Sequence, residues 1–242
     1  MSARMTEQLL IVKNSNHEGA GILETVLSYH GIASHSIDLS TGEMFPDPQN
    51  YRALVVLGGP QSANDKTVTM QNEIQQIKRA LDAEIPFLGI CLGMQSLVKA
   101  GGGMVMKCPV KETGFLDADG LAYRMELTSS GKESPLFNGL AESIPVFQLH
   151  GETVQLTASG MTLLATGRHC PIQAVKVGKN AYGLQCHAEL TYNMFREWCG
   201  IDTDLKRMDK VKLFEQFDAL HEEYTTTGVK LINNFLQIAG IA

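Results

Sequence analysis

The chain has 242 residues, and its 20 basic and 26 acidic side chains leave a formal net charge of −6. This charge argues against a protein that binds nucleic acid through bulk positive charge, and the hydrophobic content of 44% is too high for a disordered chain. The composition predicts a globular protein with a sizeable core, most simply one domain over residues 1–242.

The five cysteines are scattered along the chain without any CxxC pair. An odd number in this arrangement argues against a secreted disulfide framework and favours a reducing compartment. The apolar stretch near the N-terminus is far shorter than a membrane span, and no small-residue cleavage site follows it. We therefore expect a cytoplasmic protein with neither a membrane segment nor a nucleic-acid partner.

Short apolar runs alternate with amphipathic stretches in the first hundred residues. The apolar runs predict buried strands at residues 9–12, 53–59 and 85–93. The amphipathic stretches predict helices at residues 19–30, 70–81 and 94–100. Because strands joined by crossover helices form parallel sheets, we expect an α/β fold in three layers: an open, mostly parallel sheet with helices on both faces.

The middle of the chain, roughly residues 104–183, contains shorter strand-like pieces separated by Gly, Pro and Ser. These pieces predict a small set of antiparallel strands at the edge of the sheet. Helical patterns return near the C-terminus, where the TTTG segment predicts a break between two helices, at residues 210–224 and 229–238. Residues 190–242 are expected to form a helical extension packed on the same domain.

The segment PFLGICLGMQSL carries the strongest chemical signal in the chain. An apolar strand leads into Cys91, with Gly89 two residues before it and Gly93 two residues after it, and a helical pattern follows. This is the pattern of a nucleophile elbow with cysteine in place of serine, in which the glycines permit a tight turn and the helix N-terminus favours the thiolate. The alternative is a buried cysteine that serves only as a small apolar residue, which the flanking glycines disfavour.

A cysteine nucleophile needs a base and usually a third group that orients the base. The segment GLQCHAEL supplies His187 and, two residues later, Glu189, whose side chains face the same side of an extended backbone. His150 and His221 have a glutamate at the same offset, but His221 lies in a helical pattern, where that offset separates the side chains. Spacing alone therefore leaves His187 and His150 as alternatives.

Acyl transfer also requires hydrogen-bond donors for the developing oxyanion. The segment LGGP places Gly59 in a loop directly after a predicted strand, where its N–H group is unobstructed. The N–H group of Leu92, beside the nucleophile, would be the second donor. By itself the LGGP segment is also compatible with a simple tight turn.

Three motifs in this order strongly resemble those of the class I, triad-type glutamine amidotransferases: GGP at residues 58–60, GICLGMQ at 89–95 and GLQCHAE at 183–189. The resemblance continues through FQLHGETV at residues 147–154 and extends from residue 9 to about residue 198. Within this family the chain looks most similar to stand-alone relatives of the GMP synthase glutaminase domain, a group that includes plant γ-glutamyl peptidases.

The resemblance implies that Cys91 attacks the side-chain amide of glutamine to form a γ-glutamyl thioester, which water hydrolyses to glutamate. His187 would act as the base and then as the acid for the leaving ammonia, with Glu189 orienting His187. No cofactor or metal is implied. The other site residues implied by the resemblance are the oxyanion donors Gly59 and Leu92 and the substrate-binding positions Gln95, Gly114 and Phe115, the last two through their backbone.

The chain departs from the family pattern in two respects. The family usually has HPE where this chain has HAE at residues 187–189, which relaxes the backbone between the two groups but keeps both. The chain also lacks an ATP-pyrophosphatase signature, and too few residues follow Glu189 for a synthetase domain. Any synthetase that accepts the ammonia is therefore expected to act in trans.

Two alternatives to glutamine hydrolysis remain open at the level of sequence. The same triad would cleave the γ-glutamyl bond of a peptide or conjugate, because both substrates give the same acyl intermediate. A regulatory or binding module that retained the scaffold is the other alternative, and the presence of Cys91, His187 and Glu189 argues against it.

The remaining histidines and cysteines give weaker signals. The pairs His169–Cys170 and Cys186–His187 lack the paired spacing of a zinc site, so no metal site is expected. Cys108 and Cys199 are interpreted as structural.

Overall fold

The structure of the protein, a computed structural model, describes residues 8–242. The expectation that the N-terminus lacks a targeting segment falls partly on residues 1–7, which lie outside the described residues. In the part that is described, no helix has both the length and the apolar character needed to cross a membrane.

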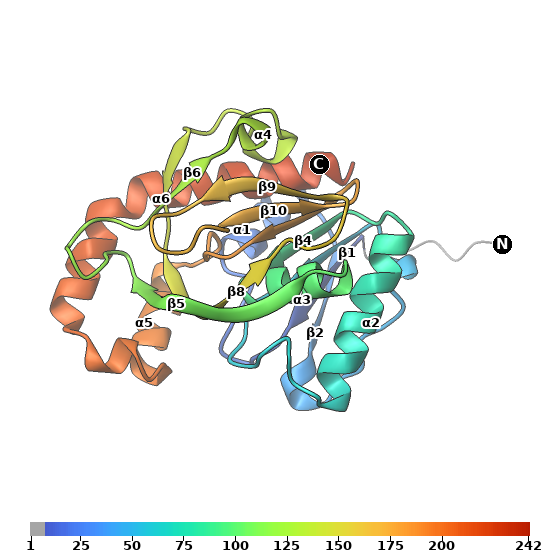
Figure 1. Cartoon of the computed structure of the whole chain (residues 1–242), viewed down its shortest axis with the longest axis horizontal. Helices are drawn as coiled ribbons and strands as arrows, with labels where there is room; N and C mark the ends of the chain where they lie inside the picture. The colour runs from blue at the N-terminus through green and yellow to red at the C-terminus, as the bar shows by residue number, and fades with distance from the viewer. Residues whose placement is uncertain (1–7) are drawn as a thin grey trace.

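A nine-stranded sheet forms the middle layer of residues 8–242 (Figure 1). The strand order is β2-β1-β3-β4-β11-β10-β9-β6-β7, in which the first five strands are parallel and the others pair antiparallel at one edge. The parallel strands are β1 (Leu9–Lys13), β2 (Ser34–Asp38), β3 (Ala53–Val56), β4 (Phe87–Ile90) and β11 (Ala181–Leu184). The antiparallel strands are β6 (Arg124–Leu127), β7 (Ser143–Pro145), β9 (Met161–Thr166) and β10 (Ala174–Val177). The predicted α/β class is confirmed.

Helices cover both faces of the sheet because the strand residues alternate between two apolar cores. Leu9 and Ile11 point into one core, and Leu10 and Val12 point into the other. The first core lies under α1 (Ile22–His30), α5 (Tyr192–Ile201) and α6 (Lys210–Ile238). The second lies under α2 (Val68–Asp82) and α3 (Leu92–Ala100) (Figure 1), and the short α4 (Ser129–Lys132) sits beside β9. These layers confirm the three-layer prediction.

A separate two-stranded ribbon lies beside the sheet. It pairs β5 (Met104–Gly114) antiparallel with β8 (Gln148–Gln155). Residues 144–150, which lie within the region of predicted antiparallel strands, divide between β7 in the large sheet and β8 in the ribbon. The register of β5 against β8 shifts between Lys107 and Glu112, which makes room for additional residues on β5.

The C-terminal helix corrects one prediction. The break expected at TTTG is wrong, because α6 runs without interruption through residues 225–228. A Cβ atom at Gly228 would lie 2.3 Å from the carbonyl oxygen of Ala188. The glycine is therefore explained by close approach of the helix to another segment, and the helical hydrogen bonds continue through it.

The edge strand β2 was not predicted. Of its residues SHSID, only Ile37 is buried, so the apolar periodicity that reveals the other parallel strands is missing. Pairing with β1 along its whole length supplies the backbone hydrogen bonds that define the strand.

Candidate active site

Cys91 occupies a strained turn between β4 and α3. Its φ angle of 52° lies in the left-handed region, which residues with a Cβ atom rarely adopt. A Cβ atom at Gly89 would lie 2.5 Å from the backbone of Gly93, and one at Gly93 would lie 2.1 Å from the carbonyl oxygen of Val56. Both flanking glycines are thus required by close backbone contacts, and the turn has the form that the motif predicts.

His187 and Glu189 lie beside Cys91, beyond the end of the neighbouring strand β11. His187 Nδ1 is 2.7 Å from Glu189 Oε1, and both side chains are almost completely buried. The side chain of Cys91 lies close enough to His187 to act on the pKa of its imidazole. The imidazole ring also packs edge-on against Trp198, with 4.9 Å between ring centroids. The structure therefore brings together the three side chains of the predicted triad.

The pKa of His187 is raised well above its ordinary value. Burial alone would lower this pKa, but the charge of Glu189 and the nearby side chain of Cys91 outweigh burial. The charged imidazolium is consequently favoured at this position, as expected for a ring between a carboxylate and a thiol.

The segment that carries His187 and Glu189 is held from two sides. The hydroxyl of Tyr224, on α6, donates to the carbonyl oxygen of His187 at 2.6 Å. The backbone N–H of Ile22, at the start of α1, donates to the carbonyl oxygen of Glu189 at 2.8 Å. Because this segment lies beyond the last ladder pair of β11, these bonds add to the isolated β-bridge in which the His187 N–H donates to the carbonyl oxygen of Phe147 at 3.0 Å.

The two predicted oxyanion donors lie next to each other in space. A Cβ atom at Gly59 would approach the side chain of Leu92 to 3.1 Å. Leu92 is the first residue of α3, so its N–H group has no acceptor within the helix. Both residues, together with Cys91, line one cavity of about 360 Å³.

Gln95 lines the same cavity, and its amide group has defined partners. Its Nε2 donates to the carbonyl oxygen of Glu152 at 3.1 Å and to Gln185 Oε1 at 3.3 Å. Gln185 in turn directs its Nε2 at Cys91 Sγ, 3.8 Å away. Sequence reasoning missed Gln185, although it lies within the GLQCHAE motif, because nothing in the pattern distinguishes it from a structural glutamine.

Gly114 and Phe115 stand apart from the cavity that Cys91 lines. Gly114 has a φ angle of 90° and faces Met208 and Leu213. The Phe115 ring is fully buried against several aromatic rings, including those of Phe147 and Phe217. The substrate-binding role expected of their backbone stays a prediction.

A second cavity, of about 420 Å³, adjoins the first and shares Pro60, Leu149, Asp202 and Thr203 with it. Its wall includes Glu18, whose Oε2 is buried with no hydrogen-bond partner among residues 8–242. Burial raises the pKa of Glu18 to about 7, the charge of His187 lowers it, and those of Glu189 and Asp202 raise it further. No sequence pattern pointed to Glu18, because its proximity to the triad results from the path of the chain after β1.

His150, the alternative base, lines the cavity but does not take the place of His187. Its Nε2 lies 2.9 Å from Glu112 Oε2, and its Nδ1 faces the carbonyl oxygen of Glu152 and the thiol of Cys108. Of the two histidines in the pairs considered from the sequence, His169 pairs with Asp117 and His187 pairs with Glu189.

Comparisons with known proteins agree with this geometry. Residues 22–197 match the family described as glutamine amidotransferase class-I. The glutamine amidotransferase-like protein YfeJ of Salmonella typhimurium is 34% identical over 151 residues, which are 60% of each chain. The glutamine-hydrolysing GMP synthase of Thermosipho africanus is 31% identical over 147 residues, 60% of this chain but 26% of the synthase. The chain therefore spans less than two thirds of either relative.

Solved structures extend the similarity to the fold of nearly the whole chain. A glutamine amidotransferase from Thermotoga maritima superposes with a TM-score of 0.83 at 27% identity, covering 96% of this chain and 98% of the other. One from Methylobacillus flagellatus gives a TM-score of 0.84 at 24% identity over 96% and 95% of the two chains, a likeness of fold. By the extent of the family match, this chain belongs to the class I glutamine amidotransferases.

Proposed function

We propose that the protein hydrolyses the side-chain amide of glutamine to glutamate and ammonia through a γ-glutamyl thioester on Cys91. The observation that carries this proposal is the contact of Cys91, at its strained turn, with the buried His187–Glu189 pair. Nucleophile, base and orienting carboxylate in this arrangement support acyl transfer.

The proposed reaction begins with transfer of the Cys91 thiol proton to His187. The sulfur attacks the amide carbon, and the N–H groups of Gly59 and Leu92 stabilise the oxyanion. As the C–N bond breaks, His187 returns the proton to the leaving nitrogen, which departs as ammonia. A water molecule then gives a proton to His187 and attacks the thioester. As the C–S bond breaks, His187 returns this proton to the sulfur, which releases glutamate and the Cys91 thiol.

Glu189 and Gln185 support these steps in different ways. Glu189 holds the Nδ1 side of the ring, so that the other nitrogen serves Cys91, and its charge stabilises the imidazolium. Gln185 contacts the Cys91 sulfur and the Gln95 side chain, so it links the nucleophile to a substrate-binding position.

A second candidate is hydrolysis of γ-glutamyl peptides or conjugates. The cavity of about 420 Å³ beside the triad favours it, because ammonia as a leaving group needs no such volume. Its wall carries the carboxyl groups of Glu18 and Asp202, which suit a leaving group that bears an amine. Both candidates share the acyl-enzyme and differ only in what leaves.

The ammonia released from glutamine is a substrate for synthetases, and the GMP synthase relatives are glutamine-hydrolysing by name. A synthetase acting in trans is therefore a candidate partner for this chain. A non-catalytic binding module remains the outcome if Cys91 proves unreactive.

The deciding experiment incubates the purified protein with glutamine, glutathione and γ-glutamyl dipeptides and measures released glutamate and ammonia. We expect turnover that Cys91→Ser abolishes and Cys199→Ser, at a buried cysteine in α5, retains. Labelling of Cys91 by a glutamine-like electrophile is expected in parallel. Absence of both turnover and labelling in the folded protein would favour the binding module.

The variant Ile201→Trp separates the two substrates, since Ile201 lines the second cavity and not the one that contains Cys91. Loss of peptide turnover with retention of glutamine turnover would identify the second cavity as the leaving-group site. Peptide turnover that remains at the wild-type rate would exclude that use of the cavity.

A further inference from the structure

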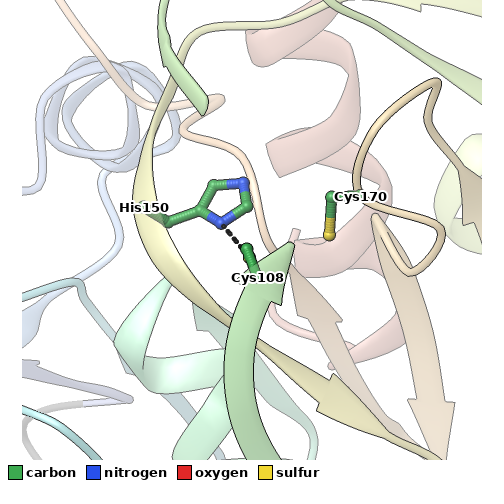
Figure 2. A group of neighbouring side chains, drawn as sticks. All are labelled: Cys108, His150 and Cys170. Atoms are coloured by element: carbon green, nitrogen blue, oxygen red, sulfur yellow. Dashed lines mark hydrogen bonds between the residues drawn. The ribbon is translucent and has the colours of Figure 1, made fainter. Parts of the chain in front are cut away.

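Three side chains that the proposed reaction does not use meet beside the active site: Cys108 of β5, His150 of β8 and Cys170 of the loop between β9 and β10 (Figure 2). Their candidate ligand atoms all lie within 4.8 Å of one another, and Cys108 Sγ is 3.4 Å from His150 Nδ1. We propose that Cys108, His150 and Cys170 bind a soft divalent cation, for which Zn²⁺ has the best chemical fit.

The three ligand atoms determine which metal ion fits the site. Two sulfur atoms and one imidazole nitrogen suit Zn²⁺ and exclude Ca²⁺ and Mg²⁺, which require oxygen ligands. Zinc bonds of about 2.3 Å to sulfur and about 2.0 Å to nitrogen in tetrahedral geometry place ligand atoms roughly 3.5 to 3.8 Å apart. The Cys108–His150 separation of 3.4 Å already fits, and the remaining separations, all within 4.8 Å, require an inward movement of at most about 1 Å.

The surroundings of His150 prepare it as a ligand. Glu112 Oε2 lies 2.9 Å from His150 Nε2, and the Glu112 carboxylate also accepts from Gln173 Nε2 at 3.1 Å and from the Cys170 N–H at 3.3 Å. A carboxylate at Nε2 holds a proton there, so Nδ1 is the nitrogen that binds a metal once it leaves its contact with the Glu152 carbonyl group. Glu112 and His150 are both buried, which keeps this orientation fixed.

The irregular register of the β5–β8 ribbon explains why these residues meet. Lys107 pairs with Glu152 and Glu112 pairs with His150, so β5 has several residues, including Cys108, opposite the single residue Gly151. This excess bends β5 and turns Cys108 towards His150. A regular ladder, with its fixed alternation of side chains, has no such freedom.

The cluster is also joined to the catalytic cavity. His150 Nδ1 lies 3.0 Å from the carbonyl oxygen of Glu152, and the same oxygen accepts from Gln95 Nε2 at 3.1 Å. Zn²⁺ on Nδ1 replaces the contact with this carbonyl group. The hydroxyl of Thr153, 3.1 Å from Cys170 Sγ, offers an oxygen for a fourth position.

Binding has a defined proton balance. Each thiol that is still protonated loses one proton as its Zn–S bond forms, and any proton that Nδ1 donates to the Glu152 carbonyl oxygen leaves as the Zn–N bond forms, so one Zn²⁺ releases up to three protons per chain. No electron transfer is involved. The alternative use of the same two cysteines is a disulfide, which would require an oxidant and would prevent both sulfurs from binding the ion.

The test titrates the full chain, reduced and stripped with a chelator, with Zn²⁺ or with Co²⁺ as a spectroscopic probe. We expect one equivalent to bind, with sulfur-to-cobalt charge-transfer bands and the intense visible bands of tetrahedral Co²⁺. Cys108→Ser and Cys170→Ser should lose the charge-transfer intensity of the altered sulfur and bind at least tenfold more weakly. Cys199→Ser and Cys91→Ser should leave the bands unchanged, which separates this site from the nucleophile and from the proposed reaction.

Other outcomes overturn the proposal. These are failure of the folded, reduced chain to bind either ion, or identical cobalt spectra in the wild type and in both cluster variants. A disulfide is favoured instead if protein purified without reductant has a mass lower by two hydrogens and a peptide map shows residues 108 and 170 linked. That link should also resist mild reduction. If a serine variant fails to fold, Glu112→Gln in the metal site's surroundings gives a second test, with an expected loss of about 10- to 100-fold in affinity.

Discussion

Cys91 combines a strained backbone with a buried position on the wall of a cavity. A left-handed backbone at a non-glycine residue costs about 1–3 kcal/mol, and it persists only where the surroundings determine it. Here the Cys91 N–H donates to the carbonyl oxygen of Leu184 at 2.8 Å, while Gly93 lies against β3. The turn therefore holds the sulfur between His187 and the cavity before any substrate binds.

The charge of Glu189 provides the first prediction at the residue scale. Glu189→Gln keeps the size of the side chain but removes the charge that stabilises the imidazolium, so kcat should fall by on the order of 10⁴-fold, with a residual rate. Cys91→Ala should have no residual thioester chemistry. Steady-state kinetics and trapping of the thioester measure the two effects.

The matched control is Glu223→Gln, a surface glutamate at the same offset from His221 that pairs with Arg124. Its kcat should equal that of the wild type. Equal and complete loss of activity in Glu189→Gln and Cys91→Ala would argue against separate roles for the two residues.

At the scale of elements, α6 is a support for the catalytic segment. Tyr224 donates to the carbonyl oxygen of His187, and one turn later Gly228 lets the helix backbone approach the carbonyl oxygen of Ala188. Both contacts act on the short stretch between the base and its orienting carboxylate. Ala188, which stands where the family usually has proline, lies in this stretch.

Replacing Gly228 by alanine tests this support, because alanine favours the helix by its intrinsic propensity but disturbs the contact with the catalytic segment. The added Cβ atom would lie 2.3 Å from the Ala188 carbonyl oxygen, so α6 or the catalytic segment has to move. We expect the free energy of unfolding to fall by about 1–3 kcal/mol, and kcat to fall with it. Urea unfolding and steady-state kinetics measure these changes.

Gly200→Ala is the control for this prediction, because Gly200 lies in α5 and a Cβ atom there has no neighbour within 4 Å. Alanine at an open helical position should leave activity unchanged and stabilise the protein slightly. Unchanged stability and activity in Gly228→Ala would show that the catalytic segment does not depend on its contact with α6.

At the scale of the whole molecule, two buried carboxyl groups make stability depend on pH. Burial raises the pKa of Glu18 and of Glu73 to about 7, although hydrogen bonds from Ser96 and Asn14 lower that of Glu73. The folded protein therefore holds these protons up to about pH 7, whereas the unfolded chain releases them near pH 4.5. Because the folded state binds more protons in this window, these two groups make stability fall as the pH rises through it.

Glu73→Gln tests this dependence away from the catalytic residues. The amide cannot ionise, so the loss of stability between pH 5 and pH 8 should shrink by on the order of 3 kcal/mol. Urea unfolding at the two pH values measures the difference. The control is Glu24→Gln, at an exposed position on α1, which should show the same dependence of stability on pH as the wild type. An unchanged pH dependence in Glu73→Gln would contradict the burial argument.

The way α6 packs also bears on dependence on a partner. Leu213 and Phe217 are buried in the core of this chain, and Phe214 and Leu220 pack against it. Because this apolar stripe is already covered, we predict that turnover of the true substrate does not depend strongly on another polypeptide. The measurement is kcat of the best substrate, alone and with protein fractions of a cell extract. A large rise with a protease-sensitive fraction would restore a synthetase acting in trans.

Local patterns predicted the fold class and the elbow at Cys91, whereas spacing alone left His150 as an alternative to His187, and the family resemblance was needed to choose between them. The apolar runs of β1, β3 and β4 are continuous because both faces of these strands are buried. Such a run can be recognised in the sequence without knowing which segments pack against it. The glycines around Cys91 reflect sterics within one turn, and the offset between His187 and Glu189 reflects the alternation of an extended backbone. Each of these constraints acts within a few residues, where a sequence records it.

The tertiary structure alone decided which distant residues meet. Gly228 was interpreted as a helix break because the group it contacts, the carbonyl group of Ala188, lies forty residues earlier in the chain. Glu18 reaches the triad only through the path of the chain after β1. Cys108 reaches His150 through the irregular β5–β8 ribbon, and Cys170 reaches it through the loop between β9 and β10. Contacts between segments that are far apart in the sequence leave no periodic pattern, so packing had to bring these side chains together before their chemistry became visible.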